Sequence, residues 1–121
     1  MKTHKDLKVW KDAISHVTSI YNSTKSFPDD EKFGLTSQIR RCAVSIPSNI
    51  AEGSARNTDK DFMRFLYISL GSASELHTQL IIANNLEFLK DDQFEVLSKD
   101  TDAISKMLSG LINSIKRKNS C

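Results

Sequence analysis

Two carboxylates stand alone in long stretches of otherwise uncharged sequence. Glu52 is the only Asp, Glu, Lys or Arg in residues 42–55, and Glu75 is the only one in residues 65–86. A buried carboxylate without a partner is costly, so each should either pair with a cation or take up a proton. The cations available for pairing are Arg40, Arg41 and Arg56. This pattern predicts ion pairs between helices or subunits; the alternative is a polar ligand-binding or catalytic site.

The histidines and cysteines do not form a known catalytic or metal-binding pattern. The Glu-x-x-His ligand pairs of ferritin-like bundles are absent, and His77 and Glu75, two residues apart, face different sides of a helix. Cys42 lies in an apolar stretch, Cys121 is the last residue, and there is no Cys-x-x-Cys pair. The chain also lacks a phosphate-binding loop and a nucleophile elbow. We therefore expect no enzyme, no metal and no cofactor.

Four segments show the spacing of apolar residues that is typical of amphipathic helices. The expected helices cover about residues 6–26, 28–54, 58–85 and 91–116. The stripes expected to form the core are Trp10, Ala13, Ile14, Val17, Ile20 and Tyr21; Leu35, Ile39, Ala43, Ile46 and Ile50; Phe62, Leu66, Ala73, Leu76 and Leu80; and Leu97, Ile104, Leu108, Leu111 and Ile115.

Prolines and polar residues predict where these helices begin and end. Pro28 disfavours helical geometry in the residue before it, and the acidic residues 29–31 suit the start of the second helix. Pro47 should kink this helix without dividing it, because the apolar spacing keeps its phase. Thr58 and Asp61 resemble a capping box for the third helix. The prediction is an all-α, antiparallel up-down four-helix bundle that forms a single domain over residues 1–121, with a short basic tail at residues 116–121.

The uncharged stretches leave the second and third helices with more buried surface than one small domain can cover. Gly71 costs about 1 kcal/mol of helix propensity relative to alanine, which suggests close packing by another helix. We therefore expect these helices to form the interface of a homo-oligomer. The residues expected at this interface are Gln38, Arg41, Val44, Ser45, Asn49, Glu52, Ile68, Gly71, Ser72, Glu75 and Gln79.

Charge and hydropathy restrict the class of protein. The net charge of +2 is too small by itself to indicate nucleic-acid binding, although an oligomer would multiply it. No apolar run approaches the roughly 18 residues that could span a bilayer, and the N-terminus lacks the apolar segment of a signal peptide. The expectation is a soluble cytoplasmic protein without a membrane partner.

The sequence also resembles a known family. The motifs are Phe27-Pro28, Phe33-Gly34-Leu35, Gln38-Ile39-Arg40-Arg41, Ser45-Ile46-Pro47-Ser48-Asn49-Ile50-Ala51-Glu52-Gly53, Arg64-Phe65-Leu66, Gly71-Ser72 and Glu75-Leu76. They are similar to the four-helix-bundle family named for 23S rRNA intervening sequences, also called S23, and the match covers nearly the whole chain. The resemblance implies a ring-like homo-oligomer, pentameric in relatives. It also implies similarity to the accessory proteins of diversity-generating retroelements, which contact nucleic acid and a polymerase.

By this analogy, we expect a non-enzymatic oligomer that binds structured RNA or an RNA-associated protein partner. Phosphate contacts need only cations, and the candidates are Arg40, Arg56, Lys60, Arg64, Lys116, Arg117 and Lys118. Few aromatic residues lie among them, so the sequence does not indicate base stacking. The alternative is a purely structural scaffold for protein interaction, in which the polar strip only sets the register of the oligomer. For residues 116–118, the alternative is a simple helix end, where cations are favoured.

Overall fold

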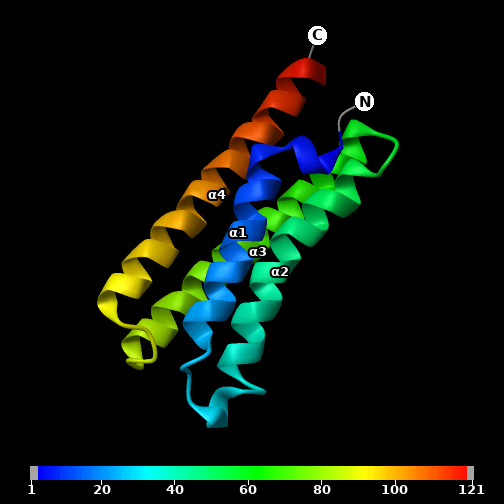
Figure 1. Ribbon diagram of the computed structural model, residues 1–121. Helices are drawn as coiled ribbons and strands as arrows, with labels where there is room; N and C mark the ends of the chain where they lie inside the picture. The colour runs from blue at the N-terminus through cyan, green and yellow to red at the C-terminus, as the bar shows by residue number, and fades with distance from the viewer. Residues whose placement is uncertain (1–2, 120–121) are drawn as a thin grey trace.

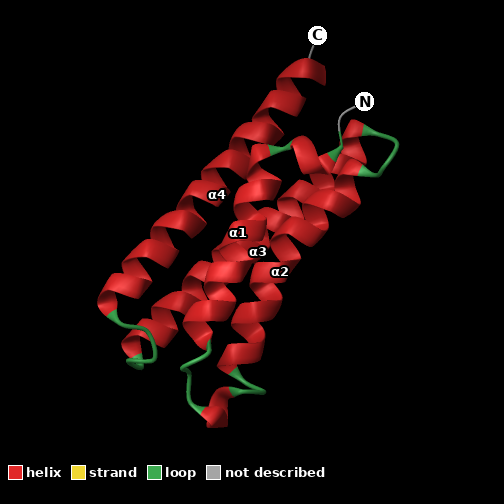
Figure 2. Ribbon diagram, in the orientation of Figure 1, coloured by secondary structure: helices red, strands yellow, loops and turns green. Residues whose placement is uncertain are grey.

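The chain folds into four long helices (Figures 1 and 2). The computed structural model describes residues 3–119, and it contains no strand within this range. The helices are α1 (Lys8–Thr24), α2 (Leu35–Ser54), α3 (Asp59–Asn85) and α4 (Asp91–Asn119), with short 3-10 helices η1 (His4–Asp6) and η2 (Asp29–Glu31). No helix in the described range is both long and apolar enough to cross a membrane.

Each helix packs against two others, which makes the structure a bundle. The packed pairs are α1 with α2, α2 with α3, α3 with α4, and α4 with α1, and the α2–α3 pair is the most extensive. In Figure 1 the chain reverses direction at each connection. The predicted all-α four-helix architecture is therefore confirmed. One end of the bundle holds the N-terminal segment, the α2–α3 turn and the end of α4, and the other end holds the remaining two connections. We call these the first end and the second end.

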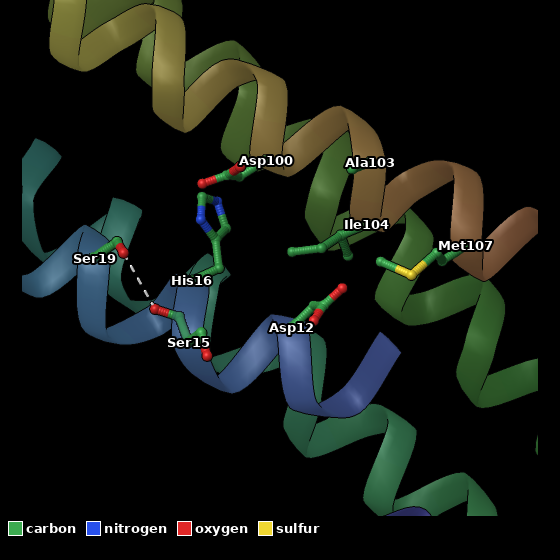
Figure 3. A pocket seen from close by; sticks show the side chains of 8 residues that line it. All are labelled: Asp12, Ser15, His16, Ser19, Asp100, Ala103, Ile104 and Met107. Atoms are coloured by element: carbon green, nitrogen blue, oxygen red, sulfur yellow. Dashed lines mark hydrogen bonds between the residues drawn. The ribbon is translucent and has the colours of Figure 1, made fainter. Parts of the chain in front are cut away.

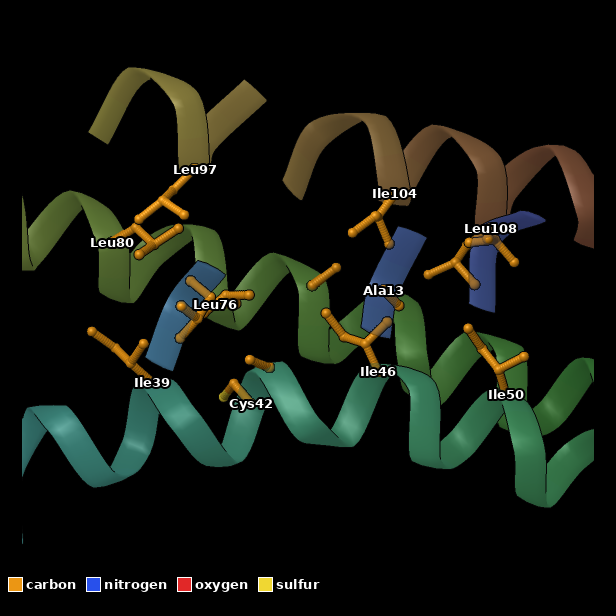
Figure 4. Close-up of a cluster of buried hydrophobic side chains, with 14 of the residues drawn as sticks. Ala13, Ile39, Cys42, Ile46, Ile50, Leu76, Leu80, Leu97, Ile104 and Leu108 are labelled. Carbon is orange, nitrogen blue, oxygen red and sulfur yellow. The ribbon is translucent and has the colours of Figure 1, made fainter. Parts of the chain in front are cut away.

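The core runs along the centre of the bundle (Figure 4). The apolar stripes predicted for the second, third and fourth helices all contribute to it, mostly as fully buried side chains. The stripe predicted for the first helix is partly wrong. Ile14 and Tyr21 are 42% and 39% exposed, whereas Val9 and His16 are buried. The apolar residues of α1 allow two orientations of the helix about its own axis, each of which buries a different face. Packing against α2 and α4 selects the orientation that buries Val9 and His16.

The second helix begins later than predicted. Residues 29–31 form a single 3-10 turn, and α2 starts at Leu35 after Gly34. The Glu31 carboxylate accepts a hydrogen bond from the backbone N–H of Leu35 at 3.1 Å. Of the three acidic residues expected at the start of this helix, Glu31 thus contacts it, from a separate turn. From there α2 continues through Pro47 as one helix.

Both ends of α3 are capped by residues close to them in the sequence, whereas α4 ends later than predicted. The Thr58 hydroxyl caps α3 by accepting from the Asp61 N–H at 3.1 Å. After Asn85, Glu87 adopts a φ of 64°, and the Phe88 N–H bonds to the Ala83 carbonyl at 2.9 Å, as in a Schellman motif. The fourth helix continues beyond the predicted end to residue 119, so most of the expected tail is helical. Positions 120 and 121, including the second cysteine, lie outside the described residues.

A glycine permits the tight junction between α2 and α3. A Cβ at Gly53 would lie 2.6 Å from the Cβ of Phe65 and 3.0 Å from the Phe62 ring. Real Cβ atoms do not approach so closely, so only glycine allows the end of α2 to rest on the start of α3. This contact positions the basic residues that surround the α2–α3 turn.

Candidate functional site

A polar groove runs between α2 and α3, on the face predicted to bind another subunit. It has a volume of about 540 Å³ and gathers residues from the start of α2 and the middle of α3. Its lining consists of Phe33, Ser37, Gln38, Arg41, Cys42, Ser45, Ser72, Glu75 and Gln79. Six of the eleven predicted interface residues therefore line one surface, which we call the α2–α3 groove.

A hydrogen bond joins the two walls of the α2–α3 groove, where the Ser45 and Ser72 hydroxyls are 2.8 Å apart. Within α2, the Asn49 amide donates to the Ser45 carbonyl and hydroxyl. Deeper in the groove, Gln79 is only 6% exposed, and its Oε1 has no hydrogen-bond partner among the described residues. In native proteins a buried acceptor of this kind bonds to a protein group or to an ordered water.

The groove cysteine is protected from ionisation. Burial, together with the neighbouring Glu75 carboxylate, raises the pKa of the Cys42 thiol to about 11. A thiol with this pKa is almost entirely protonated at neutral pH and is therefore a poor nucleophile. This agrees with the interpretation of Cys42 as a packing residue.

The five remaining interface candidates lie outside the lining of the groove. Val44 and Ile68 are 39% and 42% exposed, and Gly71 has open space where a side chain would be. Asn49 is half-buried. Glu52 pairs with Arg56 at 3.2 Å, one helical turn away, and both side chains are largely exposed. Within a single chain the carboxylates of Glu52 and Glu75 are therefore not buried.

The α2–α3 turn, the start of α3 and the end of α4 meet at the first end of the bundle (Figure 1) and are rich in basic residues. Six of the seven predicted nucleic-acid contacts lie there, on the α2–α3 turn, the start of α3 and the end of α4: Arg56, Lys60, Arg64, Lys116, Arg117 and Lys118. The structure separates Arg40 from this group. Its guanidinium lies over the Tyr21 ring at 4.5 Å, and its Nε donates to the Thr24 hydroxyl at 2.9 Å. Arg40 thus ties α2 to α1 near the second end.

The two ends of the bundle carry opposite charge. At the first end, residues 3–13, 50–70 and 107–119 contain nine basic and five acidic side chains. At the second end, residues 20–40 and 76–98 contain four basic and seven acidic side chains. The small net charge of the chain therefore conceals a strong separation of charge along the bundle.

Several cations of the first end lie against aromatic rings or carboxylates. The guanidinium groups of Arg56 and Arg64 lie over the Phe65 ring, with 4.8 and 4.5 Å between each guanidinium carbon and the ring centroid. Lys118 pairs with Asp59 at 3.3 Å. Hydrogen bonds from Asn119 and Lys118, together with the lysine charge, lower the pKa of the Asp59 carboxyl. The charge of this acidic residue is therefore compensated within the basic end.

A smaller cavity of about 290 Å³ is lined by residues of α1 and α4 (Figure 3). The His16 imidazole points towards α4 beside Asp100, and its Nε2 lies 2.8 Å from the Thr101 hydroxyl. Burial lowers the pKa of His16, whereas the charge of Asp100 acts in the opposite direction. Sequence spacing gave no sign of this contact, because the partners are 85 residues apart. Residues 3–119 contain no group of three or more His, Cys, Asp or Glu side chains placed to hold a metal ion.

Comparisons with known proteins agree on the family. Residues 5–110 match the model of the 23S rRNA-intervening sequence protein family. The structure is also similar to the crystal structure of a protein of unknown function from the S23 ribosomal protein family of Bacteroides thetaiotaomicron. The two share 28% sequence identity with a TM-score of 0.81, over 87% of this chain and 95% of that one. No curated protein matches this chain significantly.

Proposed function

Because the chain belongs to the family of 23S rRNA-intervening sequence proteins, we propose that it is a non-enzymatic, homo-oligomeric protein that binds structured RNA or an RNA-associated partner. The observation that carries this proposal is the clustering of six predicted phosphate contacts at one end of the bundle. Phosphate recognition needs cations at matching positions more than it needs a shaped pocket. A basic end opposite an acidic end would also orient the bundle on a polyanion.

Assembly is the second part of the proposal. The α2–α3 groove, the open space at Gly71 and the exposed Val44 and Ile68 all lie on the two most closely packed helices. The unpartnered Gln79 carbonyl oxygen supports a further copy that covers this face. A ring of parallel bundles would place all basic ends on one side and multiply their attraction for phosphate. A light-scattering mass equal to one chain at micromolar concentration would contradict this part.

Salt dependence tests RNA binding directly. The affinity of the full chain for a fluorescently labelled RNA hairpin is measured by anisotropy between about 50 and 200 mM salt. Each phosphate contact should contribute about −0.7 to −0.9 to the slope of log K against log salt, the range between single strands and a DNA duplex. The double substitution of Lys60 and Lys116 by alanine should reduce this slope by about two and weaken binding at every salt concentration.

The matched control removes two lysines from the second end. Lys25→Ala with Lys90→Ala makes the same change in net charge on exposed residues far from the basic cluster. It should leave the slope unchanged. An affinity of the unmodified protein that does not vary with salt, or equal losses in the two double variants, would refute recognition by the basic end.

A scaffold without nucleic acid is the alternative function, and the same face of α2 and α3 favours it. The two functions differ in their dependence on the lysines. If the protein is only a scaffold, replacing Lys60 and Lys116 should change neither the mass of the oligomer nor its binding to a protein partner. Ultraviolet crosslinking in the native cells separates them further, because only the first function predicts enrichment of a defined RNA over an untagged control.

A further inference from the structure

A groove that includes one exposed aromatic ring follows the N-terminal half of α3 at the basic end. One hollow, of about 560 Å³, is lined by Lys60, Met63, Arg64, Tyr67 and Ile68. A second, of about 600 Å³, is lined by Asn57, Asp59, Lys60, Met63 and Asn119. The two share Lys60 and Met63, so they form one continuous surface from the α2–α3 turn to the middle of α3. We call it the α3 groove.

Tyr67 gives the α3 groove a feature that simple phosphate binding does not need. Its side chain is 47% exposed although it lies within a helix of a well-packed bundle. The Lys116 ammonium lies 5.5 Å from the centre of its ring, and Lys60 and Arg64 line the same hollow. An exposed ring surrounded by cations is the arrangement with which proteins hold unpaired nucleotides: the base stacks on the ring, and the cations follow the backbone.

The other groups of the α3 groove are compatible with a nucleic-acid strand. Its one acidic residue, Asp59, is already neutralised by Lys118 at 3.3 Å and accepts a hydrogen bond from Asn119 at 3.2 Å. Asn57 is exposed at the turn and offers both a donor and an acceptor to a base edge. The thioether of Met63 provides an apolar surface in the same hollow as Tyr67.

We propose that the α3 groove binds unpaired nucleotides of an RNA, with a base stacked on Tyr67 and phosphates held by Lys60, Arg64 and Lys116. This inference rests on the proposed function and narrows its substrate class. A duplex keeps its bases stacked inside the helix, so it can use the cations but not the face of Tyr67. The protein therefore prefers a loop, bulge or single strand to a fully paired stem.

The test compares two labelled RNAs of similar charge by anisotropy: an unpaired 12-nucleotide RNA and a fully paired stem. Tyr67→Ala should weaken binding of the unpaired RNA about tenfold, the scale of one stacked base, and change binding of the stem less than about twofold. Tyr67→Phe should bind the unpaired RNA about as well as the original protein, because the ring face is kept. Tyr21→Ala, which removes a half-exposed tyrosine at the second end, should change neither affinity.

The outcomes separate this inference from the proposed function. If the stem binds with a steep salt dependence but Tyr67→Ala affects both RNAs equally or neither, stacking is refuted and phosphate recognition stands. If neither RNA binds the unmodified protein, the proposed function fails and this inference fails with it. If Tyr67→Ala lowers the oligomer mass in light scattering, the groove is covered by a copy of the chain or another protein, and the assignment to RNA is wrong.

Discussion

At the residue scale, His16 makes the stability of the bundle depend on pH. Its imidazole is 3% exposed, bonds through Nε2 to Thr101, and has no partner for Nδ1 among the described residues. Burial lowers its pKa below the ordinary value of 6.5. The unfolded chain therefore takes up a proton at a higher pH than the folded chain. Below about pH 6.5 the unfolded state binds more protons, so the folded state loses stability as the pH falls towards the lowered pKa.

The measurement is urea unfolding of the full chain at pH 7.5 and at pH 5.5. His16→Gln keeps a side chain that can donate to Thr101 but cannot be protonated, so its free energy of unfolding should decrease less between these two pH values. His77→Gln is the control, because His77 is only half-buried and bonds to Ser98 at 2.8 Å. Equal pH dependence in the His16 variant and the original protein would show that another group is responsible.

At the element scale, the α2–α3 junction depends on the absence of one side chain. Gly53→Ala would place a methyl group 2.6 Å from the Phe65 Cβ, a contact that only movement of the helices can relieve. Overpacking of this kind costs about 1–3 kcal/mol, so the variant should unfold at a lower temperature and in less urea. Gly110→Ala is the matched control, because α4 has open space at that position. It should be neutral or stabilising by up to about 1 kcal/mol, from helix propensity alone.

At the scale of the whole molecule, Gly71 tests the assembly. A side chain at this position meets nothing within 4 Å in the single chain, so Gly71→Lys should leave the bundle folded, with unchanged helical circular dichroism. If another copy packs on this face, the long charged side chain should reduce the mass measured by light scattering towards that of one chain. Gly110→Lys makes the same change where the chain is equally open, but on α4, and should not alter the mass. An unchanged mass for Gly71→Lys would place the interface elsewhere.

Charge separation along the bundle is also a property of the whole molecule. The candidates at residues 56, 60 and 64 come from the middle of the chain and those at residues 116–118 from near its end, and their clustering follows from the packing of α3 against α4. The α3 groove exists for the same reason. Tyr67 was not among the predicted contacts, because its exposure and its closeness to Lys116 are decided only when the two helices meet.

The sequence by itself determined the number of helices, most of their boundaries and three of the four core stripes, because apolar spacing, caps and prolines act within a few residues. The absence of charge also predicted an interface on the second and third helices, and six of its eleven residues line the α2–α3 groove. Only the tertiary structure decided which face of α1 is buried and that His16 is buried against Thr101. It also decided that Arg40 packs on Tyr21 instead of joining the other basic residues, and that Tyr67 lies beside Lys116. Each depends on contacts between residues that are distant in sequence, and local periodicity carries no information about which helix faces meet.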